Sequence, residues 1–155
     1  TIGKVIDMGI KDPFNMGGAM APAAVDTIEA HFRDRRIAHD YYDLIVTGDL
    51  AYVGSEIAIE LFRKHNIGIH PSRYNDCGLL IYDREKQGVQ AGGSGAACSA
   101  VVTYGHLLKR MKKGELNKIL VVATGALLSP LSYQQGESIP CIAHAVSIEN
   151  VETEK

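Results

Sequence analysis

Apolar side chains recur with two different periods along the chain, and their order predicts strands that alternate with helices. Residues 2–7 alternate apolar and polar side chains, as a short strand does. After the turn-rich segment 11–18, apolar residues return at helical spacing over 19–36, which predicts a helix. Residues 43–47 then form a short, continuously apolar run, which is typical of a strand buried on both faces.

The same alternation continues to the end of the chain. Helices with an apolar stripe are expected over 51–65 and over 92–113, and a glycine loop opens the second of them. Between these helices, CGLLIYD (77–83) is a candidate strand in a turn-rich region. Two further strands are expected over 118–124 and 141–149, joined by a loop without a helical pattern.

This order predicts an α/β fold with a mostly parallel, five-stranded sheet covered by helices. Strands joined through helices are connected by right-handed crossovers and lie parallel. The last two strands have no helix between them, so we expect the last strand to be antiparallel to its neighbour. Residues 1–150 are expected to form one domain, and the charged segment 151–155 a frayed tail.

Composition narrows the class of protein. Of the 155 residues, 46% are hydrophobic and 22% charged, as in soluble globular domains, which argues against disorder and coiled coil. The net charge of −2 disfavours nucleic-acid binding, and no apolar run reaches the ~18 residues of a membrane span. The 3 Cys form no C-x-x-C pair, which argues against a structural zinc site. The first residue is Thr1 rather than Met, so we expect a piece of a longer protein.

Two glycine-rich segments precede expected helices, at 15–18 (NMGG) and 92–95 (GGSG). A helix N-terminus presents unpaired N–H donors and a partial positive charge, so each segment is a candidate anion pocket. The alternative is that the glycines make tight turns and let helix and sheet pack closely, which is the commoner role for either motif alone. Neither segment has the spacing of a nucleotide-binding loop.

The remaining candidates are cysteines and an acid. Cys98 lies near a helix start, but its small neighbours favour a packing role over a reactive thiol. Cys77 follows Asp76, whose charge is expected to raise the pKa of the thiol. Asp49 follows a buried strand at the edge of the sheet where ligands bind, so it either acts on a ligand or caps the following helix.

The histidines show no local Ser-His-Asp pattern, although a triad need not be local. His31 lies near a helix end and is expected to be solvated. His144 stands in the middle of an apolar strand, so we expect a hydrogen-bonded core residue rather than a catalyst.

Two long segments resemble the C-terminal half of the thiolase and 3-oxoacyl-[acyl-carrier-protein] synthase superfamily. YDLIVTGDLAYVGSEIA (42–58) is similar to the strand and helix where condensing enzymes keep a catalytic His. AGGSGAACSAVVTYGHLLKRMKKGELNKILVVATGALLS (91–129) is similar to the glycine loop, helix and strand that end in the glycine-rich turn of the superfamily. The resemblance implies a thiolase-like half that packs on its own N-terminal half, with a dimer as a further option.

Departures from the superfamily pattern bear on catalysis. The synthases need a His where this chain has Gly48 and an Asn where it has Gly93, because these side chains stabilise the thioester oxyanion. Thiolases instead place a second Cys in the turn that holds Thr124 and Gly125, and a Gly-His-Pro that is absent here. The resemblance therefore implies a retained fold without condensing activity.

Three other segments resemble a sporulation branch of the superfamily from endospore-forming bacteria: residues 1–28, 75–83 and 139–150. This resemblance implies a non-catalytic protein that binds dipicolinic acid, alone or as a calcium chelate. It also implies that the protein is a soluble subunit of a membrane channel complex at the spore inner membrane. This subunit would support uptake of the acid into the developing spore and its release at germination. Neither a cofactor nor a protein-held metal is expected.

The expected ligand site lies at the carboxyl edge of the sheet, where two glycine-led helix N-termini converge and the missing His and Asn leave room for a ring. Its residues are Asn15, Met16, Gly48, Asp49, Gly93 and Ser94. Two alternatives stay open. One is an acyltransferase with a rearranged active site in which His144 or Asp49 is the base, and the other is an interaction module without a small ligand.

Overall fold

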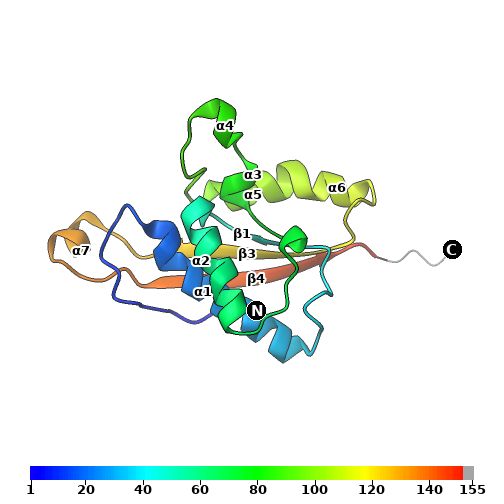
Figure 1. The fold of residues 1–155 in the computed structure, drawn as a ribbon, viewed down its shortest axis with the longest axis horizontal. Coiled ribbons are helices and arrows are strands. Elements are labelled where there is room, and N and C mark those ends of the chain that lie inside the picture. Colours follow the sequence, from blue (N-terminus) through cyan, green and yellow to red (C-terminus); the bar gives the residue numbers. More distant parts are fainter. Residues whose placement is uncertain (152–155) are drawn as a thin grey trace.

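Four strands form one mixed sheet, in the spatial order β2-β1-β3-β4 (Figure 1). The structure is a computed structural model that describes residues 1–151. Strand β1 (Leu44–Thr47) runs parallel to β2 (Tyr74–Asp76) and β3 (Lys118–Ala126), whereas β4 (Cys141–Glu149) runs antiparallel to β3. The predicted α/β class, the mostly parallel pairing and the antiparallel last strand are confirmed.

The sheet has four strands rather than the five that we predicted: two predicted segments form no strand, and β2 forms where we expected turns. Residues 2–7 form no regular strand and make only isolated antiparallel bridges to β4. Residues 77–83 are not a strand either, because α3 (Cys77–Leu80) begins there. The carboxylate of Asp76 accepts a hydrogen bond from the N–H of Gly78 and caps this helix, so local capping overrides the apolar run.

Helices cover both faces of the sheet. On one face lie α1 (Met16–Arg35) and α2 (Ala51–Lys64). On the other face, the expected third helix is interrupted: α5 (Ala97–Val102) continues through a π-helical turn (Thr103–Leu107) into α6 (Leu108–Lys112). The connections hold α4 (Arg84–Gln87), α7 (Pro130–Gln134) and a 3-10 turn (Pro71–Arg73).

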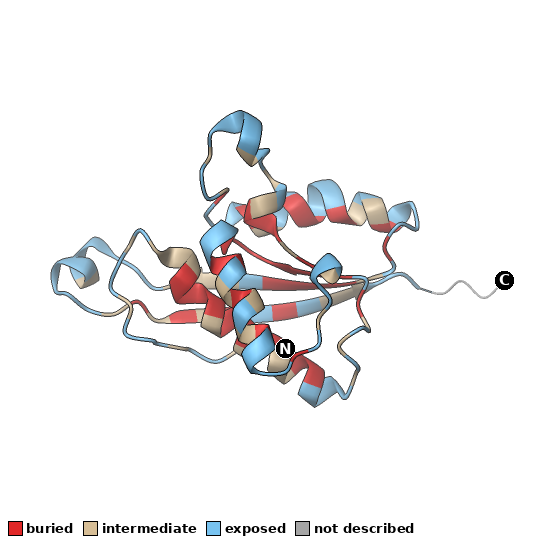
Figure 2. Ribbon diagram, in the orientation of Figure 1, coloured by how far each residue is buried: buried red, intermediate tan, exposed pale blue. Residues whose placement is uncertain are grey.

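The alternation of side chains along the strands divides the core in two. Ile45 and Leu120 pack in the cluster that includes α1 and α2, whereas Val46 and Ile119 pack in the cluster that includes α5 and α6. The expectation that β1 is buried on both faces is therefore confirmed. Figure 2 shows the buried residues in the strands and on the inward sides of the long helices, while the α4 and α7 loops are exposed.

Within the described residues, none of the helices is both long and apolar enough to cross a membrane. Of the predicted tail 151–155, all but Val151 lies outside the described residues. The long helix α1 begins at Met16, inside the segment that we expected to be a loop, so its first turn contains both glycines of the NMGG motif.

Candidate functional site

A cavity of about 300 Å³ lies where the first turn of α1, the β1–α2 turn and the glycine loop before α5 meet. Asn15, Met16, Asp49 and Ser94 line it, so the structure brings together most of the residues that we predicted for the ligand site. Phe14, Leu50 and Val53 contribute apolar surface to its wall. Gly48 and Gly93 do not line the cavity.

The two glycines that stand in the catalytic positions of the synthases are packed against protein atoms. A Cβ at Gly48 would lie 2.8 Å from Oγ1 of Thr124, and a Cβ at Gly93 would lie 2.7 Å from Cγ2 of Ile81 and 3.2 Å from Sγ of Cys98. Contacts this short mean that neighbouring atoms already occupy this space and would have to shift to admit a side chain. Our expectation that the missing His and Asn leave room for a ligand ring is therefore wrong at both positions.

Asp49 connects three parts of the site through hydrogen bonds. Its Oδ1 accepts from the hydroxyl of Thr124 at 2.5 Å, and its Oδ2 accepts from the N–H of Gly95 at 2.8 Å. The N–H of Asp49 in turn donates to Oγ1 of Thr124 at 3.1 Å. The side chain is 8% exposed, so these bonds compensate for most of its lost hydration. Asp49 thus fixes the glycine loop to the end of β3 and does not cap α2.

Asp76 caps α2 instead, and sequence reasoning missed this role. Its buried carboxylate accepts hydrogen bonds from the hydroxyl of Thr47 at 2.6 Å and from the N–H groups of Leu50, Ala51 and Gly78, each at 2.9 Å. Burial raises the pKa of Asp76, and the four hydrogen bonds oppose that effect. An Asp directly before a helix was the available signal, but we had assigned the following residues to a strand.

The backbone at Ala51 has φ 54°, an uncommon value for a residue with a Cβ. Because the carboxylate of Asp76 accepts from the N–H groups on both sides of the Leu50–Ala51 turn, it holds this conformation in place. The next N–H of α2, that of Tyr52, donates to the carbonyl of Ala91. The N–H groups of Leu50, Ala51 and Tyr52 are therefore satisfied within the protein and are not free for a ligand.

The N-terminus of α1 differs, because it lies open at the cavity. Asn15 occupies the N-cap position without a capping hydrogen bond from its side chain, and no acidic residue stands in the first turn. Among the described residues, the first N–H of α1 with an acceptor is that of Ala19, which donates to the carbonyl of Asn15. Of the two glycine-led helix entries that we expected to face a ligand, α1 presents the N–H groups of its first three residues without an acceptor in the described part of the chain, whereas in the other entry Asp49 already binds the N–H of Gly95.

Glycine also serves packing in the NMGG motif. A Cβ at Gly17 would lie 2.1 Å from the carbonyl oxygen of Leu50, and a Cβ at Gly54 would lie 2.6 Å from the carbonyl oxygen of Gly17. The two glycines let the backbones of α1 and α2 touch at the cavity wall. The anion-pocket and packing interpretations of this motif are therefore compatible.

None of the three cysteine thiols in the described residues is activated. Burial, followed by the charge of Asp76, raises the pKa of Cys77 to about 12, and burial raises the pKa of Cys141 to about 11. Burial also raises the pKa of Cys98, which is 6% exposed and packs in the core. The packing role that we expected for Cys98 is confirmed.

The predicted burial was wrong for both histidines, although His144 is hydrogen-bonded as expected. His144 is exposed on β4, where its Nδ1 accepts a hydrogen bond from the N–H of Gly3, and it does not line the cavity. His31 is buried, and its ring nitrogens bond the hydroxyl groups of Tyr42 at 2.7 Å and Thr1 at 2.8 Å. In the part of the chain that the structure describes, no cluster of three or more His, Cys, Asp or Glu side chains has the arrangement of a metal site.

Comparison with known proteins gives one consistent result. The family described as stage V sporulation protein AD matches residues 1–149. A curated protein with the name stage V sporulation protein AD, from Bacillus subtilis (strain 168), is 56% identical over 149 residues. The matched region covers 96% of this chain and 44% of that relative, so the chain spans less than half of the relative's length.

Proposed function

The chain belongs to the stage V sporulation protein AD family, and from this premise we propose that it forms part of a non-catalytic protein that binds dipicolinic acid. Membership of the family establishes a sporulation protein. In our proposal, the protein is a soluble subunit of a channel complex at the spore inner membrane. It supports uptake of dipicolinic acid into the developing spore and its release at germination.

The open N-terminus of α1 at the cavity is the observation that carries the proposal. Its unpaired N–H groups and the helix dipole favour a carboxylate. The side-chain amide of Asn15 and the hydroxyl of Ser94 add hydrogen-bonding groups, and Met16 and Val53 offer apolar surface to a ring. The volume of about 300 Å³ suits a small ring compound, at the lower end for ligand sites.

The state of Asp49 removes an objection to an anionic ligand. A free carboxylate at the cavity wall would repel a dicarboxylate, but both oxygens of Asp49 accept hydrogen bonds, from Thr124 and Gly95. These bonds direct its charge into the protein. A calcium ion carried by the ligand remains compatible with this wall, since a carboxylate oxygen can accept more than one contact.

The alternative of an acyltransferase has less support. Such an enzyme needs a nucleophile or base at the cavity, yet the described thiols have raised pKa values and His144 lies elsewhere. Asp49, the other proposed base, is engaged by two donors. The oxyanion-stabilising positions hold Gly48 and Gly93, against which other atoms pack.

Calorimetric titration of the full-length protein with dipicolinate, with and without calcium, tests the proposal. Ser94→Trp places an indole in the cavity at an exposed position, so we expect loss of binding with an unchanged circular dichroism spectrum. Glu56→Trp, on the exposed side of α2 and outside the cavity, is the matched control and should bind as the parent does. Unchanged affinity in Ser94→Trp would place the site outside this cavity.

A further inference from the structure

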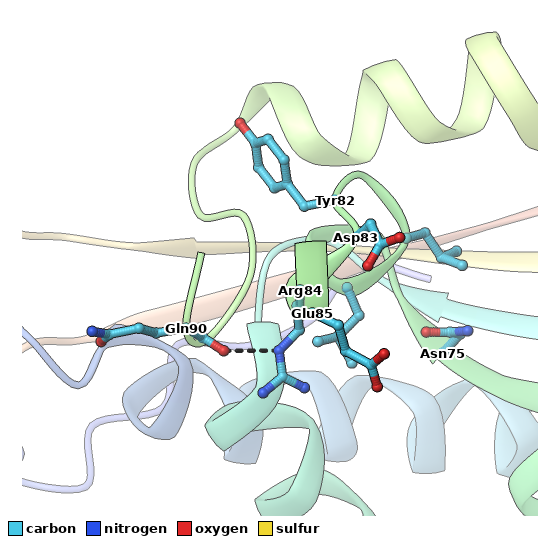
Figure 3. A pocket seen from close by; sticks show the side chains of 8 residues that line it. Asn75, Tyr82, Asp83, Arg84, Glu85 and Gln90 are labelled. Atoms are coloured by element: carbon cyan, nitrogen blue, oxygen red, sulfur yellow. Dashed lines mark hydrogen bonds between the residues drawn. The ribbon is translucent and has the colours of Figure 1, made fainter. Parts of the chain in front are cut away.

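A second concave surface shares no lining residue with the cavity. It is an open groove of about 590 Å³ between β2 and the α3–α4 connection. This connection projects from the body of the molecule (Figure 1), and Figure 3 shows the side chains that line the groove. Asn75 contributes from β2, Leu80 and Tyr82 lie at and after the end of α3, Arg84 begins α4, and Gln90 follows α4. The proposed function assigns no role to this groove.

Arg84 is held in one orientation at the edge of the groove. Its Nε donates to the carbonyl oxygen of Gln90 at 2.8 Å, as the dashed line in Figure 3 marks, and its guanidinium carbon lies 4.2 Å from the ring centroid of Tyr52. Stacking on the ring leaves the terminal amino groups free to form a bidentate pair with a carboxylate. Because the side chain is already fixed, such a pair forms at a reduced entropic cost.

Nearby acids do not neutralise Arg84. Within residues 1–151, no carboxylate oxygen lies within 4.0 Å of its guanidinium. Asp83 lines the groove too, but its carboxylate is engaged by Lys86: it accepts from the N–H of Lys86 at 3.2 Å, which caps α4, and pairs with the ammonium of Lys86 at 3.1 Å. Glu85 is exposed and also lines the groove, so it competes weakly with an incoming acid for the guanidinium.

The side chains around Arg84 have the composition of a protein interface. Leu80, Tyr52 and Tyr82 are 37%, 44% and 42% exposed, and tyrosine and arginine dominate the residues that carry binding energy at interfaces. Sites for small molecules bury 70–90% or more of their ligand. A groove this open leaves much of a small ligand in water, whereas a protein partner covers the whole rim.

We propose that this groove docks a protein partner that inserts an Asp or Glu side chain against Arg84 and an adjacent apolar side chain against Leu80 and Tyr82. The charge of Arg84, which lacks an acidic partner among the described residues, specifies the carboxylate. The exposed leucine and tyrosine specify the apolar neighbour. This inference does not depend on dipicolinic acid binding, because it concerns another surface and another class of partner.

Selection of phage-displayed random peptides on the full-length protein tests the partner's chemistry. Peptides retained by the parent protein are expected to contain an acidic residue beside an apolar one. Fluorescence anisotropy should show binding about 10- to 100-fold weaker to Arg84→Gln, the loss expected for one charge-assisted pair. Replacing the acidic residue of the peptide by its amide counterpart should weaken binding to the parent protein by a similar factor. The same replacement should not further weaken binding to Arg84→Gln.

Lys112→Gln is the matched control, because it removes one positive charge from an exposed position outside the groove lining and disturbs no acid that lines the groove. It should leave peptide affinity nearly unchanged, and Glu85→Gln should strengthen binding modestly by removing the competing carboxylate. Failure to enrich any peptide overturns the proposal. So does enrichment of peptides without an acidic residue, or of peptides that bind Arg84→Gln as tightly as the parent.

A second measurement distinguishes a partner from the remainder of the protein's own, longer chain. Tyr82→Cys introduces a thiol in the groove, and its maleimide labelling is compared with that of the parent protein, in which Cys77, Cys98 and Cys141 are buried. We expect labelling at the rate of an exposed thiol in the full-length protein. Protection of this cysteine would show that the protein's own chain fills the groove and would overturn docking of a partner there.

Discussion

Thr124 and Asp49 exchange two hydrogen bonds: the threonine hydroxyl donates to Oδ1 at 2.5 Å and accepts from the N–H of Asp49 at 3.1 Å. This pair joins the turn after β1 to the end region of β3, across two neighbouring parallel strands. Since Oδ2 of Asp49 also holds the N–H of Gly95, one side chain fixes the positions of three segments around the cavity. The shape of the proposed ligand site therefore depends on the Thr124 hydroxyl.

We expect Thr124→Val to destabilise the protein by about 1–3 kcal/mol, because it preserves side-chain volume but leaves two polar groups of Asp49 without a partner. Urea unfolding measures this loss. Thr124→Ser keeps the hydroxyl and should cost much less. Equal stability of the valine and serine variants would show that the pair contributes nothing.

Asp76 gives a prediction for pH dependence. Burial raises its pKa in the folded protein above the ordinary value of 3.8, so the folded state binds more protons than the unfolded state as pH rises from about that value. The contribution of Asp76 to stability therefore falls with rising pH, by at most about 1.4 kcal/mol per pH unit, until the raised folded pKa is passed.

The measurement is the difference in unfolding free energy between the parent and Asp76→Asn, taken at several pH values, which cancels the other carboxylates. We expect this difference to move against the parent as pH increases from about 3.8. A difference that moves in favour of the parent over the same range would show that the hydrogen bonds from Leu50, Ala51 and Gly78 outweigh burial and lower the pKa.

The glycine contact between α1 and α2 predicts a selective effect of alanine. Gly54→Ala places a methyl group 2.6 Å from the carbonyl oxygen of Gly17, so we expect the helices to separate and the free energy of unfolding to fall by about 1–3 kcal/mol. The variant should also weaken dipicolinate binding, because Gly17 lines the cavity.

Gly105→Ala is the control for this experiment. Apart from the local helix backbone, no atom lies within 4 Å of a Cβ at Gly105, which stands in the π-helical turn, so alanine there should raise stability by up to about 1 kcal/mol. Thermal unfolding of both variants gives the comparison. Equal effects at the two positions would contradict a packing role for Gly54.

Periodicity was sufficient for β1, β3, β4 and the long helices but not for the short elements, β2 included. The run LIVT is buried on both faces, as its continuous apolar character indicates. CGLL is just as apolar, but one hydrogen bond from Gly78 to Asp76 sets the backbone into a helix, and a pattern of hydrophobic residues contains no information about such a bond. Residues 2–7 alternate correctly yet pair at isolated positions only.

The candidate site was predicted in part, because proximity to the carboxyl edge follows from topology whereas the direction of each Cα–Cβ bond does not. Asn15, Met16, Asp49 and Ser94 reach the cavity through the position of their segments. At Gly48 and Gly93 the missing side chain would point into Thr124 and Ile81, respectively, and only the folded backbone shows this direction. For the same reason, His31 is buried although we expected it at the surface, and His144 is exposed although we expected it in the core. Helix ends are not uniformly exposed, and strand centres are not uniformly buried.

The packing at Gly48 and Gly93 leads to a prediction about restoring the synthase pattern. Gly48→His and Gly93→Asn reintroduce the side chains that condensing enzymes use, but their Cβ atoms would lie 2.8 Å from Oγ1 of Thr124 and 2.7 Å from Cγ2 of Ile81. Overpacking of this kind costs about 1–3 kcal/mol for each site. We therefore expect both variants of the full-length protein to unfold at lower urea concentrations and to transfer no acyl group from acetyl-CoA, as followed by release of free CoA.

Gly125→Ala, whose nearest contacts are at 3.9 Å in the same region of β3, is the control and should unfold close to the parent. A stable double variant that gains acyl transfer would show that the catalytic site persists in this fold and that two substitutions alone silenced it, which would contradict the non-catalytic role that we propose.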